Sequence, residues 1–317
     1  MGISLSSNDN ENHFKILKKD LSVIDVRGDI RNINFLEKHI KKFKPDIVFH
    51  LAAQAIVSTS YKYPIKTIET NVLGTLNLLS VLKEIKKKCT VVLITSDKCY
   101  KNIEVKRGYK ENDELGGDDF YSASKASAEL VINSFYRSYI KDKNNLLKIA
   151  TARAGNVVGG GDWSENRLIP DCVKCWSRKQ KVNVRNPNAT RPWQHVLEAL
   201  SGYLHLAQKL NDDKKINGQS FNFSNNTIKN FTVLKFIMGI KKYWKTASWK
   251  VTKQTSFHES TLLQLNSAKA KKILNWKNKL RLFETIKLVG EWYKAYYSTN
   301  KKTILTKDQI LMYMNKN

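Results

Sequence analysis

Short apolar runs alternate with longer stretches of helical periodicity through the first half of the chain. Residues 46–51, 90–95 and 147–153 are mostly apolar runs of strand length, as expected for strands buried in a parallel sheet. Apolar residues recur at helical spacing over residues 68–82, and residues 120–139 also have the pattern of a helix. Strands that alternate with helices predict an α/β fold with a doubly wound parallel sheet.

The pattern changes after about residue 156, where glycines and prolines divide the chain into loops and short elements. We predict a sheet domain over residues 1–156 and a smaller, mainly ligand-binding lobe over residues 157–317. A strand near 219–226 is expected to return to the first sheet. A ligand in such a fold binds at the carboxyl ends of the strands, between the two lobes.

Composition supports a globular protein, since 41% of the 317 residues are hydrophobic. No apolar run is long enough to cross a membrane, and the first twenty residues lack the apolar core of a secretory signal. The four cysteines are few for the length, which favours a reducing cytoplasm. Cys172 and Cys175 form a C-x-x-C pair, but no second pair lies nearby, so we expect a structural role and no metal site.

The formal net charge of +27 raises the question of nucleic acid as a partner. The lysines are spread along the whole chain, however, and basic residues do not alternate with aromatic ones in any compact segment. We interpret the charge as a solvated, lysine-rich surface without a specific nucleic-acid partner. A positive field would still attract a small anionic substrate.

The strongest local pattern is Tyr121-Ser-Ala-Ser-Lys125. A spacing of four places Tyr121 and Lys125 on one helix face, one turn apart. An ammonium near a phenol favours the phenolate, so we expect Lys125 to lower the pKa of Tyr121 toward the range of an acid/base group. Ser96 follows the second apolar run, where its hydroxyl could bind the same substrate oxygen as Tyr121.

Three further segments follow the same order. They are Asp46-Ile-Val-Phe-His-Leu-Ala-Ala-Gln54, Thr70-Asn-Val-Leu-Gly-Thr75 and Arg153-Ala-Gly-Asn156. With Ser96, Tyr121 and Lys125 they resemble the extended short-chain dehydrogenase/reductases, also called the NAD-dependent epimerase/dehydratase family. The resemblance implies a Rossmann-like fold with NAD as cofactor, bound by Asp29, Ile30, Leu51, Ala52, Ala53, Gln54, Asn71, Tyr121 and Lys125.

Two stretches resemble the CDP-glucose 4,6-dehydratases within that family: Thr95-Ser-Asp-Lys-Cys-Tyr100 and the long block over residues 152–196. This likeness implies dehydration of CDP-glucose to CDP-4-keto-6-deoxyglucose, in deoxysugar and lipopolysaccharide O-antigen biosynthesis. It implies a catalytic set of Ser96, Asp97, Lys98, Tyr121 and Lys125, and substrate contacts from Asn156, Arg185 and Arg191. Family members often pair through two long helices, so a homodimer is also expected.

The chain departs from the family at its beginning. Family members open with a strand, a G-x-x-G-x-x-G turn and a helix that bind the cofactor pyrophosphate. The sequence contains no such turn, and roughly 40 residues of the family pattern, about one βαβ unit, have no counterpart before residue 2. We therefore expect an N-terminally incomplete NAD-binding domain that binds NAD weakly. Two alternatives stay open: another NDP-sugar dehydratase or epimerase, and a non-catalytic relative that binds a nucleotide sugar.

Overall fold

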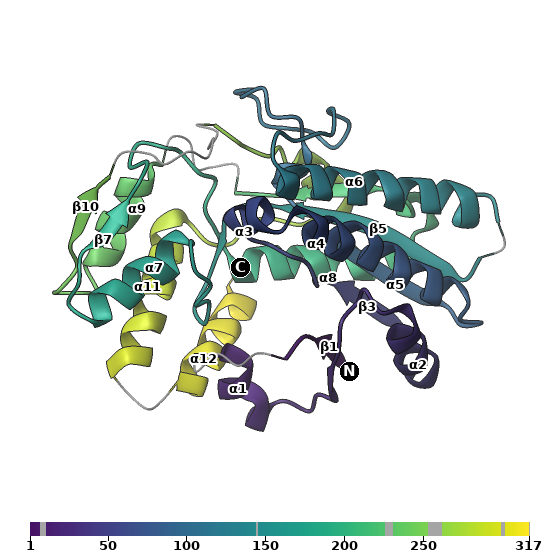
Figure 1. Cartoon of the computed structure of the whole chain (residues 1–317), viewed down its shortest axis with the longest axis horizontal. Helices are drawn as coiled ribbons and strands as arrows, with labels where there is room; N and C mark the ends of the chain where they lie inside the picture. Colours follow the sequence, from purple (N-terminus) through teal and green to yellow (C-terminus); the bar gives the residue numbers. More distant parts are fainter. Residues whose placement is uncertain (7–10, 144, 226–230, 253–261, 299–301, 317) are drawn as a thin grey trace.

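A parallel sheet of four strands forms the centre of the computed structural model, which describes residues 1–6, 11–143, 145–225, 231–252, 262–298 and 302–316 (Figure 1). The strands lie in the order β3 (Ile47–His50), β4 (Cys89–Ile94), β5 (Leu147–Ala154) and β9 (Ser220–Phe223). The first three coincide with the apolar runs in the sequence, and β9 lies within the range expected for a returning strand. The predicted doubly wound α/β fold is confirmed.

Helices lie on both sides of this sheet. Those before β5 are α2 (Ile33–Phe43), α3 (Val57–Lys62), α4 (Pro64–Ile68), α5 (Gly74–Lys83) and α6 (Phe120–Phe135). Those after β5 that cover the sheet are α8 (Val196–Asp212) and α10 (Ala268–Leu274). A π-helical turn precedes α5 and another ends α6, at Glu69–Leu73 and Tyr136–Ile140 respectively.

The two faces of the sheet bury different side chains because successive strand residues point in opposite directions. Val91 and Ile149 pack with α2, α5 and α6 on one face. Val92 and Ala150 pack with α8 on the other face. These strands are therefore covered on both sides, which explains why their sequences are continuously apolar rather than alternating.

The remaining N-terminal strands form a separate pair. β1 (Gly2–Ser4) and β2 (Asp25–Arg27) lie parallel to each other, and α2 then leads to β3. Within the described residues, β3 pairs on one side only, with β4. Ile47 and Leu51, at the two ends of β3, are each about half exposed, at 50% and 53%. The parallel strands of this domain thus form two sheets rather than one.

The C-terminal lobe has its own core, rich in aromatic side chains. Its strands are β6 (Val157–Val158), β7 (Val182–Val184), β8 (Gln194–His195) and β10 (Trp249–Val251), paired as β6–β8 and β7–β10. Its helices are α7 (Leu168–Ser177), α9 (Val233–Lys241), α11 (Leu282–Ser298) and α12 (Lys302–Asn315). Trp176 and Trp292 are almost completely buried in this core.

A short N-terminal segment joins the two units. Helix α1 (His13–Leu17) lies against α12, and His13 Nε2 is 3.2 Å from the Thr306 hydroxyl. Short 3-10 helices occur at Lys18–Asp20, Asp97–Cys99 and Lys214–Ile216, labelled η1, η3 and η5. No helix among the described residues is both long and apolar enough to cross a membrane.

Candidate active site

Two elements bring the predicted catalytic residues together at the carboxyl end of β4. Ser96 follows β4 and caps η3, where its hydroxyl accepts a 3.2 Å hydrogen bond from the Lys98 amide. Asp119 caps α6 by accepting a 2.9 Å bond from the Ser122 amide, which places Tyr121 in the first helical turn. Because η3 packs against α6, Ser96 and Tyr121 meet, as the sequence predicted.

Ser96 connects the tyrosine with a carboxylate. Its hydroxyl donates a 2.9 Å hydrogen bond to Asp97 Oδ1, and a hydrogen bond also joins it to Tyr121. All three side chains are less than 9% exposed. The arrangement can therefore exchange a proton with a hydroxyl group of a bound ligand in a site from which water is largely excluded.

The pKa of Tyr121 differs from the sequence expectation. Burial raises it to about 12, and the hydrogen bond between Tyr121 and Ser96 offsets only part of that effect. Lys125 was expected to lower this pKa, but the cation that does so here is Arg167. Burial in turn lowers the pKa of Lys125 to about 8, because the interior disfavours the ammonium form. The expectation considered only the interaction between the two side chains. It left out burial, which is the largest effect on the pKa of each group.

Asp97 is a buried carboxyl group with one oxygen left for a ligand. Burial raises its pKa, while the positive charges of Lys98 and Arg191 act in the opposite direction. Within the described part of the chain, its Oδ2 has no hydrogen-bond partner. A Cβ atom at Gly155 would lie 1.9 Å from that oxygen, so only glycine leaves room for it. Because its pKa is raised, this carboxyl group keeps a proton more readily than an exposed aspartate does and can deliver it to a bound hydroxyl.

Hydrogen bonds of the Asn71 side chain hold the loop after β3 in place. The Asn71 side chain accepts a 2.8 Å bond from the Gln54 amide and donates to the Gln54 carbonyl at 3.0 Å. It also donates to the Ser124 hydroxyl at 2.8 Å, which ties the loop to α6. Asn71 therefore supports the predicted cofactor loop, whose residues Leu51, Ala52, Ala53 and Gln54 are exposed or half-buried.

The predicted adenine contacts lie further away, after β2. Asp29 binds Arg31 through a 2.7 Å ion pair, and Arg31 also pairs with Glu69 at 2.9 Å. Ile30 is 8% exposed and packs in the core, where it fills the space above Gly74. Ile30 therefore offers a ligand little side-chain surface, whereas the Asp29 carboxylate is partly accessible.

The predicted substrate residues occupy three different surroundings. Asn156 adopts a left-handed conformation (φ 48°), which asparagine tolerates better than most residues, and its carbonyl accepts from the Gln194 amide. Arg191 is half-buried and close enough to Asp97 to act on its pKa. Arg185 is exposed and instead acts on Asp171 of α7. The structure thus brings Arg191, but not Arg185, to the centre of the site.

Sequence reasoning missed two groups beside this centre. Arg167, at the cap position of α7, lowers the pKa of Tyr121. Its signal was an arginine before the start of a proline-containing helix, a common place for an anion-binding residue. Glu129 and Arg153 form a buried ion pair next to the predicted catalytic residues, because Glu129 accepts a hydrogen bond from Thr95, which precedes Ser96. Glu129 follows Lys125 by one turn, so helical spacing could have identified it.

The C-x-x-C pair contributes nothing visible to this site. Cys172 is fully buried in the core of the C-terminal lobe, and burial raises its pKa. Cys99, in η3, is fully buried as well, and burial raises its pKa too. All four cysteines are free thiols. Within the described ranges, no three His, Cys, Asp or Glu side chains are grouped as metal ligands.

Comparison with known proteins finds a family whose model matches most of this chain. The model of the family described as GDP-mannose 4,6 dehydratase matches residues 2–289. The CDP-glucose 4,6-dehydratase of Salmonella typhimurium is 42% identical over 292 residues, which cover 91% of this chain and 81% of that protein. A UDP-glucose 4-epimerase of Mycoplasma genitalium is 25% identical, covering 93% of this chain and 89% of the relative.

Solved structures with the same fold are more distant in sequence. A dTDP-glucose 4,6-dehydratase from Bacillus anthracis, in complex with NAD, has a TM-score of 0.76 at 20% identity. The matched region covers 95% of this chain and 89% of that chain. A UDP-glucuronic acid 4-epimerase from Bacillus cereus, in complex with UDP-glucuronic acid and NAD, has a TM-score of 0.77 at 19% identity. The matched region covers 93% of this chain and 91% of that chain. At these identities the likeness establishes the fold.

Proposed function

The chain belongs to the GDP-mannose 4,6-dehydratase family, and on that premise we propose that it converts CDP-glucose to CDP-4-keto-6-deoxyglucose with NAD as cofactor. The observation that carries this proposal is the meeting of Ser96, Asp97 and Tyr121 at the end of β4. It occurs in a chain that resembles a CDP-glucose 4,6-dehydratase over most of its length. An acid and an acid/base group side by side are what a sugar dehydration requires.

The chemistry explains why both groups are needed. Water leaves from C5 and C6 of the hexose, but the proton on C5 is acidic only when C4 is a ketone. NAD, when bound, would supply reversible hydride transfer: the hydride removed from C4 would return to C6 after water has left, and a proton would return to C5, so the product is the 4-keto-6-deoxy sugar and the cofactor ends oxidised. Tyr121 would take the proton of the C4 hydroxyl while Ser96 donates a hydrogen bond to the same oxygen. Asp97 would protonate the leaving oxygen on C6, and Lys98 would remove the C5 proton or position the group that does.

The residues present fit the nicotinamide end of NAD. Lys125 is a buried cation behind Tyr121, suited to the ribose hydroxyls, and the braced loop Leu51 to Gln54 offers a surface beneath a bound ring. Deprotonation of Tyr121 requires more positive charge than the site holds alone, because burial sets its pKa at about 12. The positive charge of an oxidised cofactor would provide it.

Cationic side chains would hold the diphosphate of the substrate. Arg191 is close enough to Asp97 to act on its pKa, and guanidinium groups present fixed forks of donors to phosphate oxygens. Asn156 and Arg185 would contact the sugar and the outer part of the nucleotide. This assignment gives Arg191 the larger role, because Arg185 lies on the exposed end of β7.

Substrate preference tests the proposal. The protein, supplied with NAD, is incubated with CDP-, dTDP-, UDP- and GDP-glucose, and the 4-keto product is followed. We expect turnover with the cytidine nucleotide. Preference for another base would identify a different dehydratase, and epimerisation without loss of water would identify an epimerase. Binding of CDP-glucose without any product would favour a non-catalytic relative.

Two wider features complete the proposal. A cytoplasmic enzyme of deoxysugar and O-antigen biosynthesis agrees with four unpaired cysteines. A homodimer would bury apolar side chains that are exposed on one side of the molecule. Ile65 of α4 and Leu130 of α6, which lie on neighbouring helices, are 75% and 57% exposed.

A further inference from the structure

A buried ion pair lies behind the catalytic residues. Glu129 of α6 and Arg153 of β5 are each only 3% exposed at the side chain. Arg153 donates from Nε to Glu129 Oε1 and from Nη2 to Oε2, both at 2.8 Å, so the pair is bidentate. Burial alone would raise the pKa of Glu129, but the charge and hydrogen bonds of Arg153 outweigh it and lower that pKa. Both partners are therefore ionised.

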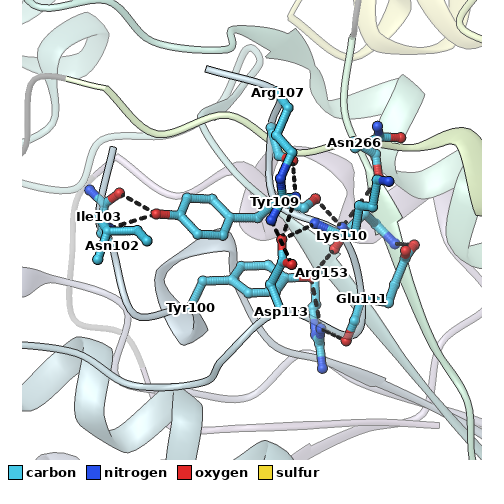
Figure 2. Close-up of polar contacts among 12 residues, drawn as sticks. Tyr100, Asn102, Ile103, Arg107, Tyr109, Lys110, Glu111, Asp113, Arg153 and Asn266 are labelled. Atoms are coloured by element: carbon cyan, nitrogen blue, oxygen red, sulfur yellow. Dashed lines mark hydrogen bonds and ion pairs between the residues drawn. The ribbon is translucent and has the colours of Figure 1, made fainter. Parts of the chain in front are cut away.

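This pair holds both ends of the segment that carries the catalytic serine. Before Ser96, the Thr95 hydroxyl donates to Glu129 Oε1 at 2.5 Å. After η3, the Tyr100 hydroxyl accepts a 2.7 Å bond from Arg153 Nη1. Figure 2 shows the second contact, with Tyr100 and Arg153 pointing toward each other. The four residues between Thr95 and Tyr100 are thus fixed at each end.

The same pair is anchored in the rest of the domain. The Thr151 hydroxyl, on β5, donates to Glu129 Oε2 at 3.1 Å. Arg153 also donates to the Glu111 carbonyl at 3.0 Å, visible in Figure 2. Tyr100 in turn donates to Asn222 Oδ1 of β9 at 2.8 Å. Because the charged groups have several partners, they cannot move without breaking a connected network.

We propose that the Glu129–Arg153 pair is a positioning device that sets Ser96 and Asp97 at a fixed distance from Tyr121 and Lys125. The pair joins β5 to the helix that carries Tyr121, with Glu129 one turn after Lys125. Through Thr95 and Tyr100 it also holds the segment after β4. The inference rests on the proposed function, because it assigns these residues to the same site. Glu129 and Arg153 act through Thr95 and Tyr100 and need not touch the substrate.

Thr95 and Thr151 provide a matched test, because each donates one hydroxyl to the Glu129 carboxylate and both are buried. Valine keeps the shape and removes the hydroxyl, while Arg153 still satisfies the carboxylate. We expect Thr95→Val to lower kcat about tenfold or more with KM and NAD affinity nearly unchanged, because small displacements of reacting groups are costly. Thr151→Val should keep near-normal kcat, and Thr95→Ser should restore the activity.

Hydrogen exchange supplies a measurement that needs no turnover. The amides of Lys98 and Cys99 should exchange faster in Thr95→Val than in the wild type, and Thr151→Val should leave them unchanged. Tyr100→Phe, which removes the other tie, should have the same effect as Thr95→Val. A wild type without activity on any nucleotide sugar would refute the proposed function, and the exchange data would still decide the positioning role. Equal exchange and equal kcat in the two valine variants would overturn the inference.

Discussion

Tyr121 is a residue for which burial and chemistry act in opposite directions. Burial raises its pKa to about 12, yet the proposed reaction needs a phenol that releases its proton near neutral pH. The protein supplies part of the correction through Ser96 and Arg167. The rest depends on charge that arrives with the ligands, so deprotonation is linked to their binding.

Replacement of Tyr121 by phenylalanine keeps the ring and removes the hydroxyl. We expect kcat to fall by a factor of roughly hundreds or more, while the affinity for nucleotide sugar changes little. Tyr139→Phe, at an exposed position late in the same helical segment, serves as the control. Steady-state kinetics with CDP-glucose and calorimetry of substrate binding separate the two effects. Near-normal kcat in Tyr121→Phe would refute the proposed mechanism.

Asp97 predicts a dependence of stability on pH. Its folded-state pKa is raised by burial, so the native protein binds this proton more tightly than the unfolded chain does. The stabilising contribution is present below the unfolded pKa and is lost as pH rises through the folded pKa, at about 1.4 kcal/mol for each tenfold difference in proton affinity. Asp97→Asn should therefore gain thermal stability relative to the wild type as the pH rises from about 4, near the unfolded pKa, to 8. A difference in unfolding temperature that is the same at both pH values would contradict this expectation.

At the scale of elements, the sequence predicted the strands and helices whose positions are determined by hydrophobic periodicity and burial. β4, β5 and α6 were predicted because their side chains are continuously apolar or helically spaced, and Ser96 and Tyr121 were predicted to meet because both follow directly from those elements. The long-range contacts were not predictable in this way. Arg185 lies apart from Arg191, and Glu129 pairs with a residue two elements away, because tertiary packing fixes those positions.

The turn after β5 shows how closely one element constrains another. Gly155 leaves room for Asp97 across the site, and its Cβ would contact the Asp97 carboxylate at 1.9 Å. Gly155→Ala should destabilise the protein by about 1–3 kcal/mol and displace Asp97, with a large loss of activity. Gly2→Ala is the control, since the nearest atom to a Cβ there is 3.5 Å away. Chemical denaturation of the two variants measures the difference, and equal stabilities would show that the turn can relax.

At the scale of the whole molecule, the proposed homodimer predicts that the face formed by α4 and α6 is the interface between the two copies. Leu130→Lys places a charge at an exposed apolar position of α6 and should shift the protein from dimer to monomer in sedimentation velocity. Leu204→Lys, at a 60% exposed position on α8, makes the same change on a helix that covers the other face of the sheet. It should leave the association unchanged. A wild type that sediments as a monomer would remove the basis for the dimer.

Cofactor affinity is a second property of the whole molecule. The 317 residues contain no G-x-x-G-x-x-G turn, which would supply backbone amides and a helix N-terminus to the pyrophosphate. We expect the polypeptide of these residues to bind NAD weakly, with an electrostatic part from the +27 charge that fades as salt increases. Calorimetry at low and moderate salt measures both effects. Salt-independent micromolar binding would show that the other contacts suffice.

The burial of single thiols has a practical consequence. Cys99 lies in η3, three residues after Ser96, and Cys172 lies in the core of the C-terminal lobe. Neither can react with a disulfide reagent until its surroundings open, so the labelling rate of each thiol reports the free energy of a local opening. The two rates respond together to urea if the domains unfold as one cooperative unit, and separately if they do not. Cys99 and Cys172 can thus act as built-in probes, one in each unit, without any engineered label.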